Sequence, residues 1–582
     1  MILKHASEIR IRAVILASAI VFGSVVYGFH FTSFLHPKEL VWCVALLCLL
    51  ALSFTDRQIP AAIRSVRPLL LLAGMTIIGL QVGFPAVPSY AIEQLCYLGM
   101  AISLAIVAFP LVRSADTYQV LQASIILSGV AVGGLALGQF AGVFTPLFPV
   151  FTGYDQLLYS VFGNQDLLGS YCAISLALLL GNWEALPWAR RYRVFALVIV
   201  GAALVLSGCR AAWLAAGITV AILLSRTASR RSVLFPAVVL TGITACIAVM
   251  YPDIVISRVT SLIQGNDTGV GLRLWFWLGG LHMWLDSPLY GLGLGNYAFW
   301  SPVVQGRALR GLYVNSLQHN DLHTIHPHND PIELLAETGL IGGLLMIWWL
   351  SQIRLKSADM GTALGLVSFA VVSLFGFPTA SFPHLALAVL FVVRLAKMPL
   401  KKPDNALRTS LQMLLLAILP LAISGRLFFV HVPSALLRGA DRAVEMGQDC
   451  SAYDAITGYF WPSPVAHFRL ALCQASRSET AVALESLDRA AEGLDTAEFH
   501  TVRAALLIRD GRNSSAEWAL EQALFRAPSS LSGYRLMLRV TREDEWDRVL
   551  KSAKRWLTPE EFGELETESL TTRAQSTEES GG

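Results

Sequence analysis

The feature that most constrains the fold is a long series of apolar stretches, each long enough to cross a membrane. By hydropathy we count about thirteen of them between residues 13 and 430. Apolar residues make up 54% of the 582 residues, charged residues only 15%, and the mean hydropathy is +0.56. This composition predicts an all-α, polytopic membrane protein.

The basic residues gather in alternate short loops between the predicted spans. This is the positive-inside pattern, and it predicts a cytoplasmic amino terminus. An odd number of spans then places outside both the long segment 251–332 and everything after residue 430, in the periplasm if the cell has two membranes. The loop residues on the predicted inner side are Arg57, Arg64, Arg67, Arg113, Arg190, Arg191, Arg193, Arg226, Arg230, Arg231, Arg354, Lys356, Arg394, Lys397, Lys401, Lys402 and Arg408.

Beyond the membrane region (1–430), residues 431–564 have the composition of a soluble, Ala-rich helical domain. Small and apolar residues recur there at a spacing of about 33 residues, a pattern that resembles degenerate tetratricopeptide repeats; a generic array of helical hairpins is the alternative. Repeats of this kind present a concave surface to peptides, which predicts a protein partner. The tail, 565–582, is polar and predicted to be disordered. The recurring residues are Ala471, Ala483, Leu487 and Ala490, matched by Ala504, Ala516, Leu520 and Ala523.

The eight cysteines do not form a metal-binding pattern. Six lie in or beside predicted spans, where cysteine behaves as a small buried hydrophobe. Cys450 and Cys473 are alone in the external domain. They either pair in an oxidising compartment or remain free thiols.

The stretch 323–343, HTIHPHNDPIELLAETGLIGG, passes from a polar run with three histidines directly into an apolar helix. Asp330 is expected to cap this helix, with Glu333 completing a capping box. His326, His328 and Asn329 therefore lie just outside a helix amino terminus, where free N–H groups favour an anion.

Further into this helix, Glu337 lies one turn beyond Glu333, and three glycines follow at 339, 342 and 343. An acid inside a span is unusual, so we expect Glu337 to pair with an arginine. The glycines predict close helix packing.

Several arginines lie on the predicted outer side, against the positive-inside trend. Arg210 follows a span, and Arg273 lies on an amphipathic segment. Either they snorkel to lipid phosphates or they bind a phosphate or diphosphate ligand, which guanidinium groups contact bidentately. A histidine beside them is suited to general-base catalysis. The remaining arginines of segment 251–332, Arg258, Arg307 and Arg310, are read as solvated loop charges.

Together these residues resemble the O-antigen ligase and polymerase superfamily of membrane glycosyltransferases. The family's ligase motif is His-Asn, nine residues, then Gly-x-x-Gly, which fits His328-Asn329 followed by Gly339 and Gly342. The stretches 163–171 (GNQDLLGSY), 207–212 around Arg210, and 273–297 also resemble family signatures. The resemblance covers most of the chain to about residue 430.

The resemblance implies a role for each matching position. His328 would be the catalytic base, Arg210 and Arg273 would bind the undecaprenyl diphosphate of a glycan donor, and His326 and Asn329 would shape the pocket. We assign Glu337 to this pocket as well. The family needs no cofactor and no metal, although His323, His326 and His328 could also be read as metal ligands.

The predicted function is therefore transfer of a glycan from undecaprenyl diphosphate to an acceptor hydroxyl on the outer face of the bacterial inner membrane. The acceptor would be another lipid-linked glycan, the lipid A core of lipopolysaccharide, or a protein, and no nucleic acid is involved. A protein O-oligosaccharyltransferase of the same superfamily is one alternative, and an anion or solute transporter is another. A third is an assembly factor that acts through its repeat domain.

Overall fold

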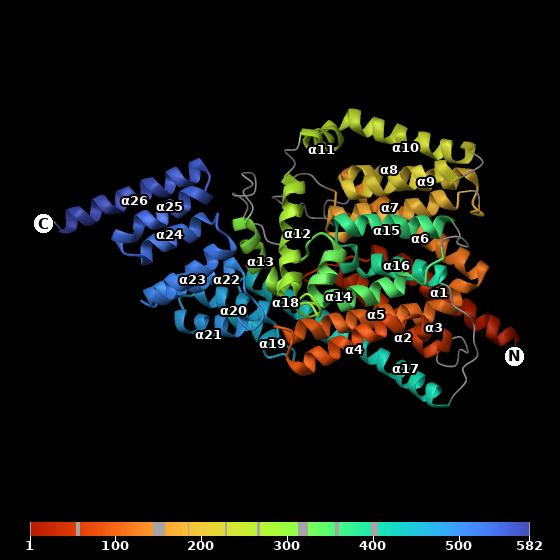
Figure 1. Ribbon diagram of the computed structural model, residues 1–582, viewed down its shortest axis with the longest axis horizontal. Coiled ribbons are helices and arrows are strands. Elements are labelled where there is room, and N and C mark those ends of the chain that lie inside the picture. Colours follow the sequence, from red (N-terminus) through yellow and green to blue (C-terminus); the bar gives the residue numbers. More distant parts are fainter. Residues whose placement is uncertain are drawn as a thin grey trace.

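The computed structural model describes residues 2–28, 30–53, 59–143, 158–183, 185–226, 230–264, 268–311, 324–354, 360–396 and 406–580. These residues fold into helices, together with an isolated β-bridge between Ile353 and Ala396. The predicted all-α class is confirmed. Figure 1 shows a bundle of long helices with the amino terminus at one end and a smaller helical domain at the opposite end.

The bundle is built around α5 and α7, whose residues are buried along most of their length. Its side chains form one continuous apolar core, as expected for helices that are hydrophobic all round. The bundle helices are α1 (Ile2–Val25), α2 (His36–Ser53), α3 (Ile59–Ser65), α4 (Arg67–Val82), α5 (Pro88–Arg113), α6 (Ala115–Phe140), α7 (Gln165–Gly181), α8 (Arg190–Leu206), α9 (Arg210–Arg226), α10 (Arg230–Met250), α14 (Asp330–Leu350), α15 (Met360–Phe375), α16 (Phe382–Leu395) and α17 (Ala406–Arg426).

The predicted count of about thirteen spans is not confirmed. Within the described ranges, five helical segments are long and apolar enough to cross a membrane: α2, α5, α6, α14 and Leu416–Glu445. The pair α10 and α11 (Pro252–Gln264), bent by 97°, gives a sixth if counted as one span. Helices α4, α7, α15 and α16 are apolar but shorter. At about 1.5 Å per residue, they fall short of a hydrocarbon layer of about 30 Å.

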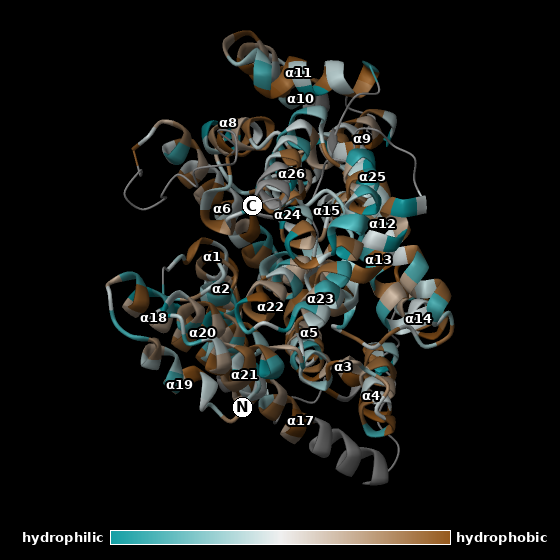
Figure 2. Cartoon of the chain, turned by 90° about the vertical axis from the view of Figure 1, so that its left-hand side faces the viewer, coloured by the Kyte–Doolittle hydropathy of each residue, from teal (hydrophilic) through white to brown (hydrophobic). Residues whose placement is uncertain are grey.

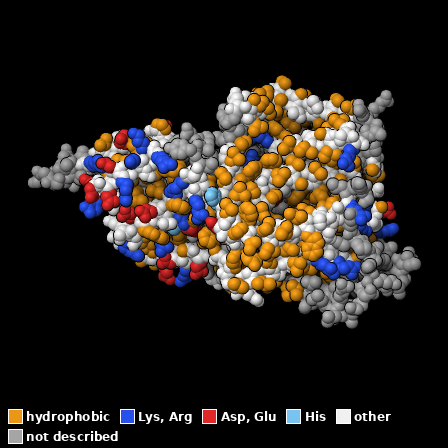
Figure 3. Space-filling model, viewed as in Figure 1, with side chains coloured by type: hydrophobic (Ala, Val, Ile, Leu, Met, Phe, Trp, Pro, Cys, Tyr) orange, Lys and Arg blue, Asp and Glu red, His pale blue; other side chains and the backbone are white. Residues whose placement is uncertain are grey.

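Three of the predicted inner loops meet at one end of the bundle. The guanidinium of Arg113 donates to the carbonyl of Ala396 (2.7 Å), that of Arg394 donates to Val112 (2.5 Å), and the backbone N–H of Arg354 donates to Leu395 (3.0 Å). Apolar side chains cover much of the bundle surface in Figure 3, whereas charged side chains gather at its two ends and on the smaller domain. The chain is therefore a multi-pass membrane protein.

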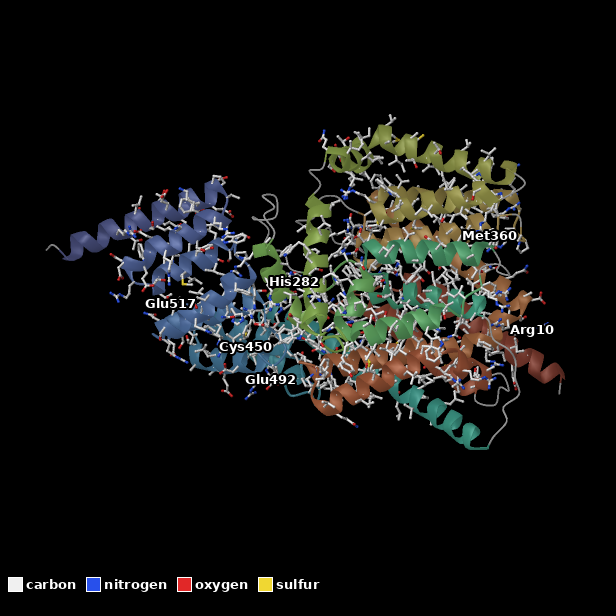
Figure 4. All side chains as sticks on the ribbon, viewed as in Figure 1. Arg10, His282, Met360, Cys450, Glu492 and Glu517 are labelled. Carbon is white, nitrogen blue, oxygen red and sulfur yellow. A yellow bond between two sulfur atoms is a disulfide. The ribbon has the colours of Figure 1, made fainter. Side chains whose placement is uncertain are left out.

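The predicted external segment 251–332 contains α11, α12 (Thr268–Asp286) and α13 (Tyr297–Gly311). In Figure 1, α12 stands across the end of the bundle, between it and the smaller domain. Figure 4 labels His282 on α12, with Arg10 and Met360 toward the far end of the bundle and Cys450, Glu492 and Glu517 in the smaller domain.

The smaller domain comprises α18 (Val432–Glu445), α19 (Asp454–Thr457), α20 (Pro464–Ser476), α21 (Thr480–Ala490), α22 (Ala497–Arg509), α23 (Asn513–Arg526), α24 (Leu531–Val540), α25 (Trp546–Trp556) and α26 (Pro559–Ser580). All eight residues of the 33-residue spacing are buried in its helix pairs. That burial explains their recurrence, while the tetratricopeptide assignment stays a prediction. Cys450 and Cys473 form a disulfide.

The join between the two parts is a continuous helix, because a π-helical turn (Leu427–His431) connects α17 to α18. The predicted boundary at residue 430 falls inside it. The smaller domain also contacts the start of α5: the indole N–H of Trp461 donates to Glu93 (2.9 Å), and the hydroxyl of Tyr90 donates to the carbonyl of Gly493 (3.0 Å). In Figure 2, which views the molecule from the end that carries the smaller domain, α25 is largely hydrophilic.

The tail predicted to be disordered from residue 565 is instead helical to Ser580, as part of α26. Leu565 is fully buried in the core of the smaller domain. The guanidinium of Arg535 pairs with Glu564 and Glu568 on one face of the helix. The prediction from composition did not include the burial of Leu565 or the ion pairs of Arg535 with Glu564 and Glu568.

Candidate functional site

The site lies where α14 begins. Asn329, not Asp330, caps this helix: its side-chain oxygen accepts the N–H of Ile332 (3.0 Å), and its amide donates to the carbonyl of Leu374 (2.8 Å). The predicted capping box is therefore wrong by one residue. The carboxylate of Asp330 instead accepts the hydroxyl of Thr379 (2.6 Å), because the turn after α15 comes close to it.

The site helix is broken at Gly339, whose φ of +61° and ψ of −164° are not helical. The loop 287–293 forms hydrogen bonds with the backbone groups that this break leaves without helical partners. The N–H groups of Leu340 and Ile341 donate to carbonyls at 288 and 289, and those of Leu292 and Gly293 donate to carbonyls at 336 and 337. A Cβ on Gly339 would lie 2.4 Å from the carbonyl carbon of Leu289. This glycine therefore serves a helix break and a loop contact, not the helix packing that we predicted.

Glu337 lies just before this break and is buried. Its carboxylate accepts the backbone N–H of Tyr297 (3.1 Å), at the start of α13. The structure records no arginine ion pair for Glu337 among the described residues. Its observed role is to fix the loop that carries α13 against the site helix.

Three charged or titratable residues from separate elements meet at the end of the bundle. Arg273 on α12 forms an ion pair with Asp166 on α7 (3.1 Å), and the Nδ1 of His328 lies 3.8 Å from the same carboxylate oxygen. Asn164 caps α7 by accepting the N–H groups of Asp166 and Leu167, which places the acid in the first helical turn. Asp166 therefore connects a predicted donor-binding arginine to the predicted base.

His328 is held between aromatic rings. It stacks on Phe276 of α12 (centroids 5.8 Å apart) and meets the edge of Phe377 (4.7 Å), and its backbone φ is +55°. Burial lowers the pKa of His328 to about 4; the charge of Asp166 opposes this and that of Arg273 adds to it. The imidazole is thus neutral near pH 7 and able to accept a proton.

His326, two residues earlier, points to a different partner. Its Nδ1 lies 2.8 Å from Glu333, and its ring stacks on Phe377 (5.0 Å). Burial alone would lower the pKa of His326, but the Glu333 carboxylate beside it raises the pKa above its ordinary value. The two histidines share Phe377 yet have opposite protonation preferences.

Arg210 is the first residue of α9, next to Cys209, which packs closely against Gly169 of α7. The turn before it has Gly208 at φ +64°, and a Cβ there would lie 3.1 Å from the Nε of Arg258. The start of α9, at Arg210, therefore lies beside α7. Arg258, interpreted from sequence as a solvated charge, lies against the turn that precedes Arg210.

Sequence reasoning missed Asp166, Phe276 and Phe377 as individual site residues. The stretch GNQDLLGSY was noted, and its Asn164 cap followed by an acid was the available indication for Asp166. The two aromatic residues carry no such indication, because a phenylalanine near an apolar helix is ordinarily part of a core. Only their ring contacts with His328, stacked for Phe276 and edge-on for Phe377, identify them.

Within the described ranges, no group of three His, Cys, Asp or Glu side chains is placed to hold a metal ion. His323, one of the three histidines in the metal reading, lies outside those ranges.

The fold and the site define a helical membrane protein with a polar, arginine- and histidine-containing site at one end of its bundle. Residues 195–347 match the family model described as O-antigen ligase, which supports the resemblance to the O-antigen ligase and polymerase superfamily. The match includes Arg210, Arg273, His328, Asn329 and Glu337. No curated protein matches the chain.

Proposed function

We propose that this protein transfers a glycan from undecaprenyl diphosphate to an acceptor hydroxyl, on the outer face of the bacterial inner membrane. The product would be a surface polysaccharide or a glycosylated lipid or protein. The observation that carries the proposal is the cluster of His328, Asp166 and Arg273 within a chain that has an O-antigen ligase domain. The cluster supplies a neutral base and a permanent cation side by side.

In this proposal, His328 removes the proton of the acceptor hydroxyl. Its low pKa keeps the ring unprotonated, although a base works best when its pKa lies near the working pH. A bound diphosphate would raise the pKa of His328 toward the working pH, because a nearby negative charge raises the pKa of an imidazole. The enzyme would then activate its base only when the donor is present.

Arg273 and Arg210 would hold the donor diphosphate. Guanidinium groups remain charged and bind phosphate oxygens bidentately. The acceptor oxygen attacks the anomeric carbon, and the bond from that carbon to the diphosphate oxygen breaks. The electron pair leaves on undecaprenyl diphosphate, whose developing charge the arginines stabilise. A single displacement of this kind inverts the anomeric configuration.

The proposal is tested by a mass profile of undecaprenyl-linked glycans in cells that carry His328→Ala, compared with cells that carry His467→Ala in the smaller domain. Accumulated single repeat units would indicate a polymerase. Accumulated long chains would indicate a ligase or a protein-glycosylating enzyme. A profile equal to that of the control would overturn the proposal and favour transport.

A further inference from the structure

A basic cavity of about 460 Å³, open to solvent and lined mostly by exposed side chains, lies between α13 of the membrane part and α25 of the smaller domain. Among the described residues, four cationic side chains line it, together with a hydroxyl and an indole ring, and none of these lining residues is acidic. The lining residues are Arg310, Arg548, Lys551, Ser552, Arg555 and Trp556. A concentration of positive charge like this one attracts an anion.

The two halves of the cavity are held firmly together. The guanidinium of Arg310 donates to the carbonyls of Leu524 (3.1 Å) and Phe525 (2.8 Å) at the end of α23, and it lies 4.3 Å from the Phe525 ring. A Cβ on Gly306 would lie 2.3 Å from the Phe525 carbonyl oxygen, so the helices pack backbone to backbone there. The cavity is therefore a fixed feature of the interface between the two parts.

The positive charges are only partly compensated. Arg548, at the exposed rim, pairs with Glu545 (3.1 Å) and Glu517 (3.7 Å). Burial lowers the pKa of Arg310; Tyr534 opposes this shift, and the positive charge of Arg555 adds to it. Among the described acids, the ion pairs recorded at the cavity are those two on Arg548. Arg310 donates to uncharged backbone carbonyls, so its charge and that of Lys551 favour an anionic ligand.

An apolar cluster lies between the cavity and the candidate active site. Trp556, in its wall, packs in one apolar cluster with Trp275, Phe276, Ala308 and Leu309. Phe276 is the ring on which His328 stacks. Trp275 fixes α12 to α13 by donating its indole N–H to the carbonyl of Gln305 (2.7 Å). A short row of aromatic rings therefore separates the cavity from the proposed base.

We propose that this cavity binds a phosphate ester on the sugar acceptor and so positions the acceptor's hydroxyl toward His328. The inference rests on the proposed function, because it assumes that a glycan acceptor approaches His328. The cations bind the phosphate, while the indole ring and the Ser552 hydroxyl suit the sugar that carries it. A phospholipid headgroup offers the same chemistry and is distinguished below.

The test uses the full-length protein in phosphatidylcholine nanodiscs, titrated calorimetrically with glucose 6-phosphate and with glucose. The informative variant is Lys551→Glu. Its matched control is Lys554→Glu, the same charge change at another exposed residue of α25, where Lys554 lies over the Phe562 ring outside the cavity lining. Thermal unfolding of both variants checks that they fold.

We expect the wild type to bind glucose 6-phosphate more tightly than glucose. Lys551→Glu should weaken that binding about tenfold or more, the contribution of a charge-assisted hydrogen bond, while Lys554→Glu should change it about twofold or less. Equal effects of the two variants, or no preference for the phosphorylated sugar, would overturn the proposal. Loss of sugar phosphate binding in phosphatidylglycerol nanodiscs would also overturn it, because a lipid headgroup would then occupy the cavity.

The two proposals fail in different ways. Binding in this assay needs no turnover, so His328→Ala should leave it unchanged. If the wild type binds the sugar phosphate but transfers no glycan, the proposed function fails and the anion site stands. If transfer occurs but Lys551→Glu leaves both binding and the acceptor KM unchanged, the anion site alone fails.

Discussion

The ion pair between Asp166 and Arg273 should matter for transfer far more than its length suggests. Asp166→Asn keeps the shape of the side chain and removes its charge. Arg273 would lose its counter-ion in a place where the side chains are only 13% (Asp166) and 21% (Arg273) exposed. Asp166 also lies 3.8 Å from His328, so the substitution changes the electrostatics of the proposed base.

The expected magnitude follows from burial. A hydrogen bond to a charged group contributes about 1.5–3 kcal/mol, which corresponds to about 10- to 100-fold in kcat/KM. An equally short ion pair, Arg307 with Asp286 at 3.1 Å, has side chains 48% and 47% exposed. Exposed pairs of this kind contribute about 0–1 kcal/mol. Asp286→Asn is therefore a matched control, and it should leave transfer within about twofold of the wild type.

The assay is glycan transfer by purified protein at several pH values. Because Asp166 raises the pKa of His328 against the effect of burial, its neutralisation should lower that pKa further. The acid limb of kcat/KM should then move to lower pH as the rate falls. A loss of activity equal to that of Asp286→Asn, or an acid limb that does not move, would refute the role given to Asp166.

Three other perturbations test the rest of the structure. In the wild type, the acid limb of kcat/KM should lie well below pH 6.5, because the pKa of His328 is lowered to about 4 and the base stays neutral until the pH approaches that value; an inflection near 6.5 would show that the ring is not buried as described. Gly339→Ala should destabilise the protein by about 3 kcal/mol or more, since it adds a clash to a strained φ, whereas Gly343→Ala, whose Cβ would meet only the flexible Leu335 side chain, should be mild; equal thermal shifts for the two would contradict the helix break. Cys450→Ser should cost the smaller domain about 3 kcal/mol by opening a loop closed across 23 residues; protease resistance unchanged from the wild type would contradict this.

The helical class could be predicted from sequence because it follows from composition, which needs no knowledge of partners. The burial of residues such as Ala483 and Leu520 also follows from a local pattern, since small residues at a fixed spacing let helices pack closely. The number of membrane spans could not be predicted from composition and local pattern in this way. Apolar helices such as α7 and α16 are buried by neighbouring helices and fall short of the membrane's thickness.

Within the site, sequence identified the stretch but not its contacts. Both Asn329 and Asp330 are good helix caps, and the choice between them depends on Thr379, 49 residues away in the chain. From sequence alone, Gly339 is interpreted as a helix-packing residue. The structure instead shows a helix break at Gly339 with the loop 287–293 bonded to it. Asp166 joins His328 and Arg273 only because α7, α12 and the start of α14 meet at one end of the bundle.

The central claim is most directly tested by donor cleavage in a defined system. Purified full-length protein in nanodiscs, given a fluorescent undecaprenyl diphosphate glycan, an acceptor preparation and a chelator, should release undecaprenyl diphosphate as the glycan moves to the acceptor. His328→Ala should abolish this release, while His467→Ala should retain it. Release by His328→Ala at the wild-type rate would contradict the assignment of the base.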